Sequence, residues 1–305
     1  MTRFQNSGEG LGCGLFLYFC CGIIGQENMK YYIVDAFTDK PFGGNPAGVV
    51  LLDGKNYPDE DLMLKVAAEF RYSETAFVRQ DCRDEFTIRY FTPRAEVELC
   101  GHATIASFAV LKHIGLPGGQ YLCHTKAGAL SITVGDKVMM QMAKPRIVGT
   151  LKYEDVEEMY RAVGAQPTDL RPQIVYAGLP DIMLPIATLA ELQSLQPNME
   201  AVTTVTRRLN VVSIHAFVDN SDGYTAHVRD FAPLYGVPEE SATGTANAAL
   251  TYYLAQNGLI GSTAECRFLQ GEAMGRPSVV ASKIDSDGTI YVGGTAAIVA
   301  EGMLL

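Results

Sequence analysis

The chain has 305 residues, with 24 Lys and Arg against 34 Asp and Glu, so its formal net charge at pH 7 is −10. Apolar residues make up 48% and charged residues 19%, which is the composition of a folded globular protein and not of a disordered segment. Because this acidic balance offers no basic surface to neutralise phosphate groups, we expect neither nucleic acid nor a membrane as a partner. The length predicts two domains, since one domain usually takes about 150 residues.

Residues 1–28 differ from the rest of the chain. Residues 11–24 form an apolar run that is too short to span a bilayer comfortably. The run is similar to the apolar region of a signal peptide, but Arg3 is its only basic flank. We interpret residues 1–28 as an extension, from a start codon read too early, with an export signal as the alternative. The core then begins at Met29, runs to Leu305, and is predicted to be cytoplasmic.

The cysteines predict neither disulfides nor a metal site. There are seven of them, an odd number, and no two form a C-x-x-C pair. Reduced thiols in a cytosolic protein fit this pattern better than a disulfide framework. Cys123 and His124 are adjacent, but neighbouring residues of a strand point to opposite faces and make a poor pair of ligands. We therefore predict no structural metal.

In chain order, the core begins with a predicted strand over residues 31–37. A Met-rich strand over residues 138–142 ends near a proline, and an acidic helix is predicted over residues 154–163. We place the domain boundary between these two elements, at residues 144–150. Both halves mix short β-branched runs with helices, so the predicted class is α+β. The two predicted domains are residues 29–146 and residues 147–295.

An internal repeat supports two related halves. At one constant offset, and without gaps, four positions match: Arg89 with Arg229, Phe91 with Phe231, Pro93 with Pro233 and Ala106 with Ala246. Each segment precedes a helix that is apolar on nearly every face, predicted over residues 103–113 and 245–256 and ended by Gly115 and Gly258. Such helices lie inside proteins, so we expect each domain to be a mixed sheet wrapped around a central helix. The first N–H groups of each helix are free to bind an anion.

Six short segments, taken in their order and spacing, carry a family resemblance. They are Val34-Asp35-Ala36-Phe37, Phe42-Gly43-Gly44-Asn45-Pro46-Ala47, Ser73-Glu74-Thr75-Ala76-Phe77-Val78, Arg89-Tyr90-Phe91-Thr92-Pro93, Cys100-Gly101-His102-Ala103-Thr104 and Ala242-Thr243-Gly244-Thr245-Ala246. From Met29 onward the chain resembles the phenazine-biosynthesis-like (PhzF-type) isomerases, which have the diaminopimelate-epimerase fold. The resemblance implies a cytosolic homodimer that needs no cofactor, with its active site between two pseudo-symmetric domains. It also implies that the last strand, residues 296–305, returns to the first domain.

The resemblance implies that Glu74 is the catalytic carboxylate. Residues 72–78 form a strand-like run with apolar residues on both parities, so we expect Glu74 to be buried on both faces of a sheet. A carboxyl group in such a setting can both take and return a proton. The alternative is a structural ion pair with Arg71 or Arg79.

His102 and Glu240 are the other predicted catalytic residues. His102 lies at a helix N-terminus, where the positive end of the helix disfavours imidazolium, so a neutral ring could donate a hydrogen bond or relay a proton. The alternative for His102 is a helix cap or a satisfied core histidine. The family pattern Glu-Asp-Pro-Ala-Thr-Gly-Ser reads here Glu239-Glu240-Ser241-Ala242-Thr243-Gly244-Thr245, so Glu240 replaces the usual Asp and is one methylene longer. The remaining histidines are interpreted as structural: His113, His124, His215 and His227.

The predicted substrate-binding groups lie in turns and at the two helix N-termini. Gly43-Gly44-Asn45-Pro46 is a turn that lets the backbone approach a ligand closely. The N–H groups of Gly244 and Thr245 could bind a carboxylate. The complete predicted set is Asn45, Ser73, Cys100, Gly101, Gly244 and Thr245.

The leading hypothesis is a cofactor-independent isomerase that moves a proton on a small carboxylate, with Glu74 as acid and base. A second hypothesis is a racemase or epimerase that uses Cys100 with Glu240, because the ungapped repeat pairs these two positions. Cysteine-dependent enzymes of the same fold use two facing cysteines, and no second cysteine occupies the matching position here. Cys100 could also be a small buried apolar residue. A third hypothesis is a catalytically silent member that binds a ligand or a protein.

Overall fold

The computed structural model describes residues 29–304 with the exception of 55, 220 and 221. The predicted extension, residues 1–28, lies outside the described residues, and so do three of the seven cysteines: Cys13, Cys20 and Cys21. In the described part of the chain, no helix is both long and apolar enough to cross a membrane.

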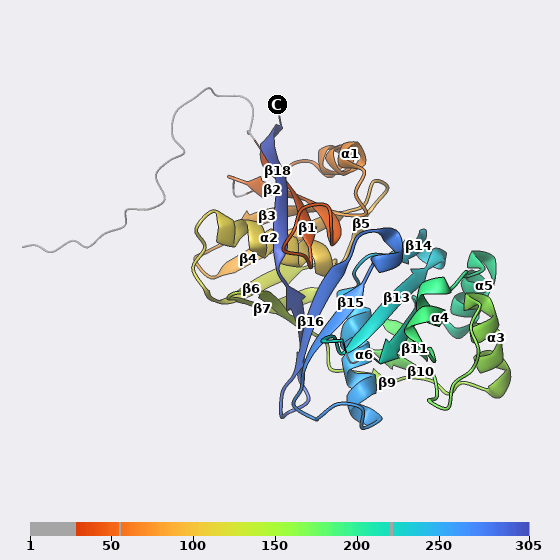
Figure 1. The fold of residues 1–305 in the computed structure, drawn as a ribbon. Coiled ribbons are helices and arrows are strands. Elements are labelled where there is room, and N and C mark those ends of the chain that lie inside the picture. The colour runs from red at the N-terminus through yellow and green to blue at the C-terminus, as the bar shows by residue number, and fades with distance from the viewer. Residues whose placement is uncertain (1–28, 55, 220–221, 305) are drawn as a thin grey trace, which may run out of the picture.

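The N-terminal half is a mixed sheet with two helices (Figure 1). Its elements are β1 (Met29–Ala36), β2 (Asn45–Leu52), α1 (Glu60–Phe70), β3 (Thr75–Gln80), β4 (Glu85–Phe91), β5 (Glu96–Val97), α2 (Gly101–His113), β6 (Gly119–Thr125), β7 (Gly128–Val134) and β8 (Val138–Gln141). The last strand of the chain, β18 (Ala296–Leu304), pairs antiparallel with β1 and so belongs to this half.

The C-terminal half has the same architecture with more helices on its outer side. Its elements are β9 (Arg146–Ile147), α3 (Tyr153–Val163), β10 (Gln173–Tyr176), β11 (Pro180–Pro185), α4 (Leu189–Ser194), α5 (Met199–Leu209), β12 (Ile214–Asp219), β13 (Ala226–Ala232), η1 (Pro233–Tyr235), β14 (Val237–Glu240), α6 (Gly244–Gln256), β15 (Glu265–Gln270), η2 (Glu272–Met274), β16 (Ser278–Ile284) and β17 (Ile290–Gly294).

Strand pairing repeats between the halves. In the first half β2 and β3 are parallel, β3 and β4 antiparallel, and β4 and β6 parallel. In the second half β11 and β12 are parallel, β12 and β13 antiparallel, and β13 and β15 parallel. An antiparallel pairing of β8 with β17 joins the two halves into one continuous sheet. The α+β prediction with two pseudo-symmetric halves is therefore confirmed.

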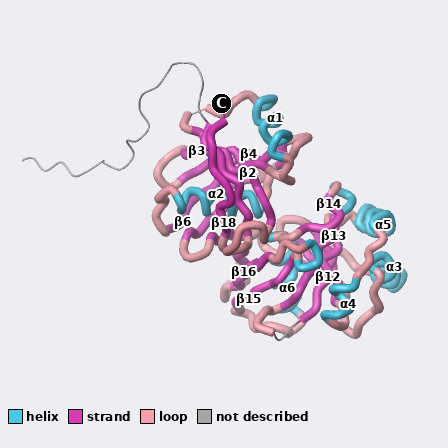
Figure 2. The backbone as a smooth tube through the Cα atoms, turned by 45° about the horizontal axis from the view of Figure 1, so that its top comes forward, coloured by secondary structure: helices cyan, strands magenta, loops and turns pink. Residues whose placement is uncertain are grey.

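Each half is built around one apolar helix, α2 or α6, which the strands enclose (Figure 2). Both helices have 13 residues, and residues around their whole circumference are buried, as their lack of a polar face predicts. Both end at a glycine with positive φ: Gly115 at 109° and Gly258 at 71°. The residue after each glycine donates its N–H to a carbonyl of the last turn at 2.9 Å, so the two predicted stop signals act as expected.

The structural repeat contains a gap that the ungapped comparison missed. The offset that matches Phe91 with Phe231 would start the second central helix at Ser241, whereas α6 starts at Gly244. The additional residues form the short helix η1, which the described residues of the first half do not have between β4 and β5. The pairing of Cys100 with Glu240 is therefore wrong. The N-cap of α2 is Cys100, and the N-cap of α6 is Thr243.

The glycine turn ties the halves together instead of facing a ligand cavity. Arg276, between η2 and β16, donates to the carbonyl oxygens of Gly43 and Gly44 and forms an ion pair with Asp35 at 2.6 Å. Gly44 has φ +63°, and a Cβ atom there would lie 2.2 Å from the carbonyl oxygen of Ala36. Only glycine fits this crossing, so the expectation that the turn approaches a ligand is corrected.

Candidate active site

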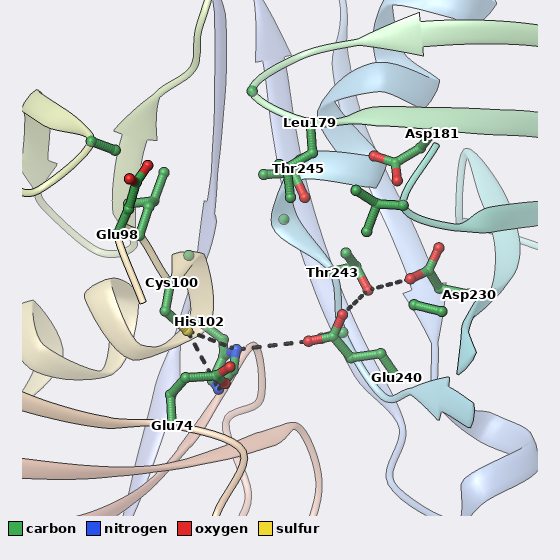
Figure 3. Close-up of a pocket in the computed structure, with 18 residues that line it drawn as sticks. Glu74, Glu98, Cys100, His102, Leu179, Asp181, Asp230, Glu240, Thr243 and Thr245 are labelled. Atoms are coloured by element: carbon green, nitrogen blue, oxygen red, sulfur yellow. Dashed lines mark hydrogen bonds and ion pairs between the residues drawn. The ribbon is translucent and has the colours of Figure 1, made fainter. Parts of the chain in front are cut away.

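A cavity of about 380 Å³ lies between the two halves (Figure 3). From the N-terminal half it is lined by Glu74, Glu98, Leu99, Cys100, Gly101, His102 and Ala127. From the C-terminal half it is lined by Gly178, Leu179, Asp181, Val212, Asp230, Ala232, Glu240, Ala242, Thr243, Gly244 and Thr245. The volume suits a small-molecule ligand, and the wall combines apolar groups with several titratable ones.

Glu74 lies in the turn between α1 and β3, one residue before the strand begins. The expectation that it is buried on both faces of a sheet is wrong, because its side chain is 21% exposed and faces the cavity. Its Oε2 atom lies 3.4 Å from Nε2 of His102. Arg79, one of the two alternative ion-pair partners, pairs with Asp81 at 2.7 Å. The position leaves the carboxylate of Glu74 accessible to a ligand.

His102 is buried in the first turn of α2 and touches both catalytic carboxyl candidates. Its Nδ1 lies 3.8 Å from Oε1 of Glu240, and its Nε2 lies 3.3 Å from the hydroxyl of Ser73. Burial lowers the pKa of His102, although the charge of Glu74 acts in the opposite direction. A neutral ring with carboxyl groups on two sides can donate to one of them and accept from the other.

Glu240 ends β14 and is held by side chains from both halves. Its Oε1 accepts a hydrogen bond from Asn45 Nδ2 at 3.0 Å, and its Oε2 lies 2.6 Å from the hydroxyl of Thr243. Burial, and next the charge of Asp230, raise the pKa of Glu240 to about 8. At neutral pH this carboxyl group is therefore largely protonated and can act as an acid.

Cys100 is the N-cap of α2 and lies 3.4 Å from Nδ1 of His102 through its Sγ atom. Burial, followed by the charge of Glu74, raises the pKa of this thiol well above its usual value. The nucleophile or base in a cysteine enzyme is the thiolate, which this setting disfavours. The corresponding N-cap of α6 is Thr243, so the facing position has no second thiol.

The predicted backbone sites lie at the cavity wall. Gly101 of α2 and Gly244 and Thr245 of α6 line it, and neither helix has a side-chain hydrogen bond at its N-cap. Among the described residues, the hydrogen bonds provide no acceptor for the N–H groups of these three residues. Two facing helix N-termini with free N–H groups form a favourable place for a carboxylate.

Two predicted binding residues do not line the cavity. Asn45 is buried at the start of β2 and donates to Glu240 and to the carbonyl oxygen of Ala242. Ser73 is exposed beside Glu74 and contacts His102. Both side chains can orient a cavity residue without touching a ligand themselves.

Sequence reasoning missed four polar residues of the cavity wall: Glu98, Asp181, Asp230 and Thr243. Asp230 belongs to β13, in which every residue is buried. The repeat carried a signal for it, because Asp230 stands where the first half has Tyr90. A carboxyl group in the middle of a buried strand indicates a polar network or a site.

In the described part of the chain, Glu74, Cys100 and His102 form a group that could hold a metal ion. One ligand atom from each lies within 4.8 Å of the others, the kind of donor set that zinc accepts. The same three groups are equally suited to proton transfer, and the sequence predicts no metal here.

Comparison with known proteins identifies the family. The model of the family described as phenazine biosynthesis-like protein matches residues 34–302. An uncharacterized isomerase of Deinococcus radiodurans is 34% identical over 300 residues, which cover 90% of this chain and 94% of that protein. A phenazine biosynthesis-like domain-containing protein of Bos taurus is 32% identical over 303 residues, covering 90% and 99% of the two chains.

Solved structures agree with the fold. The crystal structure of the Bacillus anthracis phenazine biosynthesis protein of the PhzF family has a TM-score of 0.82 and 26% identity, covering 92% of this chain and all 100% of the other. A hydroxyproline epimerase from Agrobacterium vitis has a TM-score of 0.59 at 13% identity over 92% and 93% of the two chains, and this likeness concerns the fold alone. The chain therefore belongs to the phenazine biosynthesis-like (PhzF) family, whose curated relatives include proteins named isomerases, and it has a diaminopimelate-epimerase-like fold.

Proposed function

We propose that this protein is a cofactor-independent isomerase that moves a proton on a small carboxylate substrate. The observation that carries the proposal is the arrangement of Glu74 and His102 from one half and Glu240 from the other around one cavity. The atoms of His102 lie 3.4 Å from Glu74 and 3.8 Å from Glu240, so the three groups form a connected set.

In the proposed reaction Glu74 is the base that takes a proton from a carbon atom of the substrate. Its carboxylate faces the cavity and lies beside His102. Glu240 is the acid that supplies a proton at another position, since its raised pKa keeps it protonated near neutral pH. His102, neutral and buried, lies 3.4 Å from Glu74 on one side and 3.8 Å from Glu240 on the other, so it lies between the two carboxyl groups. The net change is an allylic shift of one proton.

The substrate carboxylate would bind at the N-termini of α2 and α6. The N–H groups of Gly101, Gly244 and Thr245 can donate to its oxygens, and the helix dipoles favour a negative charge there. Among the described residues that line the cavity there is no Lys or Arg, so the backbone supplies this recognition. Recognition by backbone groups is compatible with several small carboxylates.

Two further expectations complete the proposal. On the strength of the family resemblance, the protein acts as a homodimer in the cytoplasm. Light scattering of the purified chain behind a size-exclusion column tests the oligomeric state, and cell fractionation tests the location.

The racemase alternative has some support from the cavity, because Cys100 lines it. The raised pKa of its thiol and the hydroxyl of Thr243 at the facing N-cap weigh against thiolate chemistry. A collapsed cleft would favour the silent binding member, whereas a cavity of about 380 Å³ is present. An isomerase in which Glu74 and Glu240 transfer protons to and from the substrate is therefore the better supported function.

The test is solvent exchange across a panel of small unsaturated, hydroxy and amino carboxylates in D₂O. Proton NMR and mass spectrometry should show one deuterium in product or recovered substrate for the compounds that the enzyme accepts. Exchange that is abolished in Cys100→Ser and retained in Glu74→Gln would overturn the assignment in favour of the racemase.

A further inference from the structure

A chain of carboxyl and hydroxyl groups runs from Glu240 into the C-terminal half. Its members, in order, are Glu240, Thr243, Asp230, Ser213 and Asp181. Four members line the cavity, all but Ser213, and Asp230, Ser213 and Asp181 are each 1% exposed. Figure 3 shows the cavity end of this carboxyl–hydroxyl chain, with Thr243 between Glu240 and Asp230.

Four oxygen–oxygen contacts connect the members. The hydroxyl of Thr243 lies 2.6 Å from Glu240 Oε2 and 3.1 Å from Asp230 Oδ2. The hydroxyl of Ser213 lies 2.7 Å from Asp230 Oδ1 and 2.9 Å from Asp181 Oδ1. All four distances are those of hydrogen bonds, and each such bond requires one hydrogen atom.

A count of hydrogen atoms shows where protons must sit. Thr243 and Ser213 supply one hydroxyl hydrogen each, which fills two of the four contacts. An ionised carboxylate only accepts, so the other two hydrogens must be carried by carboxyl groups of the chain. The network is complete when two of its three acids are protonated. A buried carboxyl oxygen and a hydroxyl oxygen held this close without a hydrogen atom between them would be strongly unfavourable.

Asp230 has more hydrogen-bonding side chains around its carboxyl group than the other two acids have. Thr243 and Ser213 contact it, and Nδ1 of His215 lies 2.9 Å from its Oδ1, so three groups that can each donate a hydrogen bond surround it. The outer acids have fewer donors: Glu240 has Asn45, and Oδ2 of Asp181 is buried without a partner among the described residues. The two protons therefore belong on Glu240 and Asp181. The raised pKa of each, to about 8, has burial as its first cause and Asp230 as its second.

We propose that Asp230 is a positioning residue that keeps a proton on Glu240 through Thr243, and so prepares Glu240 as the acid of the reaction. In this arrangement Glu240 donates to the hydroxyl oxygen of Thr243, and Thr243 donates to Asp230. When Glu240 gives its proton to the substrate, the negative charge of Asp230 favours its return from solvent. This inference rests on the proposed role of Glu240 as an acid.

The other groups around Glu240 do not account for its proton by themselves. From the N-terminal half, Glu74 on the loop before β3 and His102 and Cys100 on α2 face it. His102 is neutral and Cys100 is a thiol, and neither imposes a charge. Glu74 acts in the same direction as Asp230 but ranks behind it among the causes of the raised pKa. Neutralising Asp230 should therefore have the larger effect.

The test follows the titration of Glu240 directly, in the full chain and without substrate. Glutamate is labelled with ¹³C at the side-chain carboxyl, and Glu240→Gln identifies the signal. The wild-type midpoint is expected near pH 8. In Asp230→Asn the midpoint should fall by at least about one pH unit, a tenfold change in the acid dissociation constant. Asp219→Asn, an exposed carboxylate on β12, is the matched control and should leave the midpoint in place. An unchanged midpoint in Asp230→Asn would overturn the proposal.

Thr243 offers a second test that keeps the charge of Asp230. If Glu240 donates to Thr243, then Thr243→Val removes the acceptor of that proton and lowers the midpoint, and Thr243→Ser restores it. If Thr243 instead donates to an ionised Glu240, the valine variant raises the midpoint, which contradicts the proposal. The two Thr243 variants test the proposal even if Asp230→Asn does not fold.

The titration also separates this inference from the proposed function. A Glu240→Gln variant with full turnover would remove the acid role of Glu240 and with it the preparatory role of Asp230 in catalysis. Isomerase activity lost in Glu240→Gln, together with an Asp230→Asn midpoint equal to that of the wild type, would leave the function standing and refute Asp230 alone.

Discussion

The two walls of the cavity are built on one repeated frame and carry different chemistry. Glu74 precedes β3, and its carbonyl oxygen accepts the N–H of Gly48 at 3.3 Å. Ser213 precedes β12 in the same way, and its carbonyl oxygen accepts the N–H of Ile182 at 3.0 Å. The proposed base of the first wall, Glu74, thus corresponds to the hydroxyl group of Ser213 in the second. The backbone position before the strand is the same in both halves, but the side chain at that position differs.

The helix N-termini and the long central strands show the same divergence. Cys100 and Thr243 are corresponding N-caps. Tyr90 of β4 hydrogen-bonds Thr104 at 2.6 Å inside the first half, whereas its counterpart in the second half is Asp230. The first wall therefore holds the carboxyl groups of Glu74 and Glu98, and the second holds Glu240 backed by the buried Asp230 and Asp181. A base and an acid can coexist at one pH because their surroundings differ.

The largest expected effect is the loss of the base on the first wall. Glu74→Gln removes the proton acceptor and should lower turnover about 10²- to 10⁴-fold, with the fold unchanged by circular dichroism. Steady-state kinetics on the substrate found by solvent exchange measure this change. Glu69→Gln, an exposed residue of α1, is the control and should retain turnover. Full activity in Glu74→Gln would refute the assigned base.

The repeated Arg–Glu pairs provide a stability comparison between the halves. Arg229 binds Glu239 through two hydrogen bonds and donates to the carbonyl oxygens of Leu192 and Leu195. Arg229→Met leaves these acceptors unpaired and should cost about 3–5 kcal/mol of unfolding free energy. Urea unfolding followed by circular dichroism measures the loss.

The equivalent change in the first half should cost less. Arg89 is more exposed, at 22% against 10% for Arg229, and its partner Glu96 also pairs with Lys126. Arg89→Met is therefore expected to cost about 1 kcal/mol. Lys65→Met, which removes an exposed pair with Asp61, serves as the control. Equal losses of unfolding free energy in Arg229→Met and Arg89→Met would contradict this expectation.

The acid of the second wall predicts the alkaline limb of the pH profile. Glu240 must be protonated to act, so kcat/KM should be near its maximum around neutral pH and fall up to tenfold per unit above pH 8. The sign follows from the raised pKa, because raising the pH removes the proton that the reaction needs. Glu240→Gln should have lower activity and no such limb. A decline centred instead near pH 4 to 5 would exclude a buried, protonated Glu240.

The smallest effect is expected at the N-cap of the first wall. Cys100→Ser should lower turnover less than tenfold, which corresponds to less than about 1.4 kcal/mol of transition-state stabilisation. The buried thiol has a raised pKa and is not the base, so iodoacetamide should also leave activity largely intact. Abolished turnover in this variant would instead support the racemase alternative.

The sequence predicted the two central helices closely. Residues 103–113 and 245–256 were expected, and the structure has Gly101–His113 and Gly244–Gln256. Both signals are local: an apolar face on every side and a glycine after the last turn. Each half contains its own copy of these signals, so the two-part architecture could be derived without knowing any contact.

The details of the site depended on contacts between distant segments. The gap made by η1 shifts the helix by almost one turn relative to the strands, and an ungapped comparison therefore matched Cys100 with the wrong residue. The run around Glu74 is apolar on both parities, yet the strand begins only at Thr75. Strand ends are set by pairing with a neighbouring strand, which no local pattern specifies.

By itself, the sequence determined that this chain forms two related α+β halves around apolar helices and which residues are candidates for acid and base chemistry. Only the tertiary structure decided that Glu74 and Glu240 face one cavity, with the buried Asp230 behind Glu240. The reason is physical. The helix and its end depend on neighbours three or four residues away, whereas the protonation of a carboxyl group depends on the burial and charges that the whole fold brings to it.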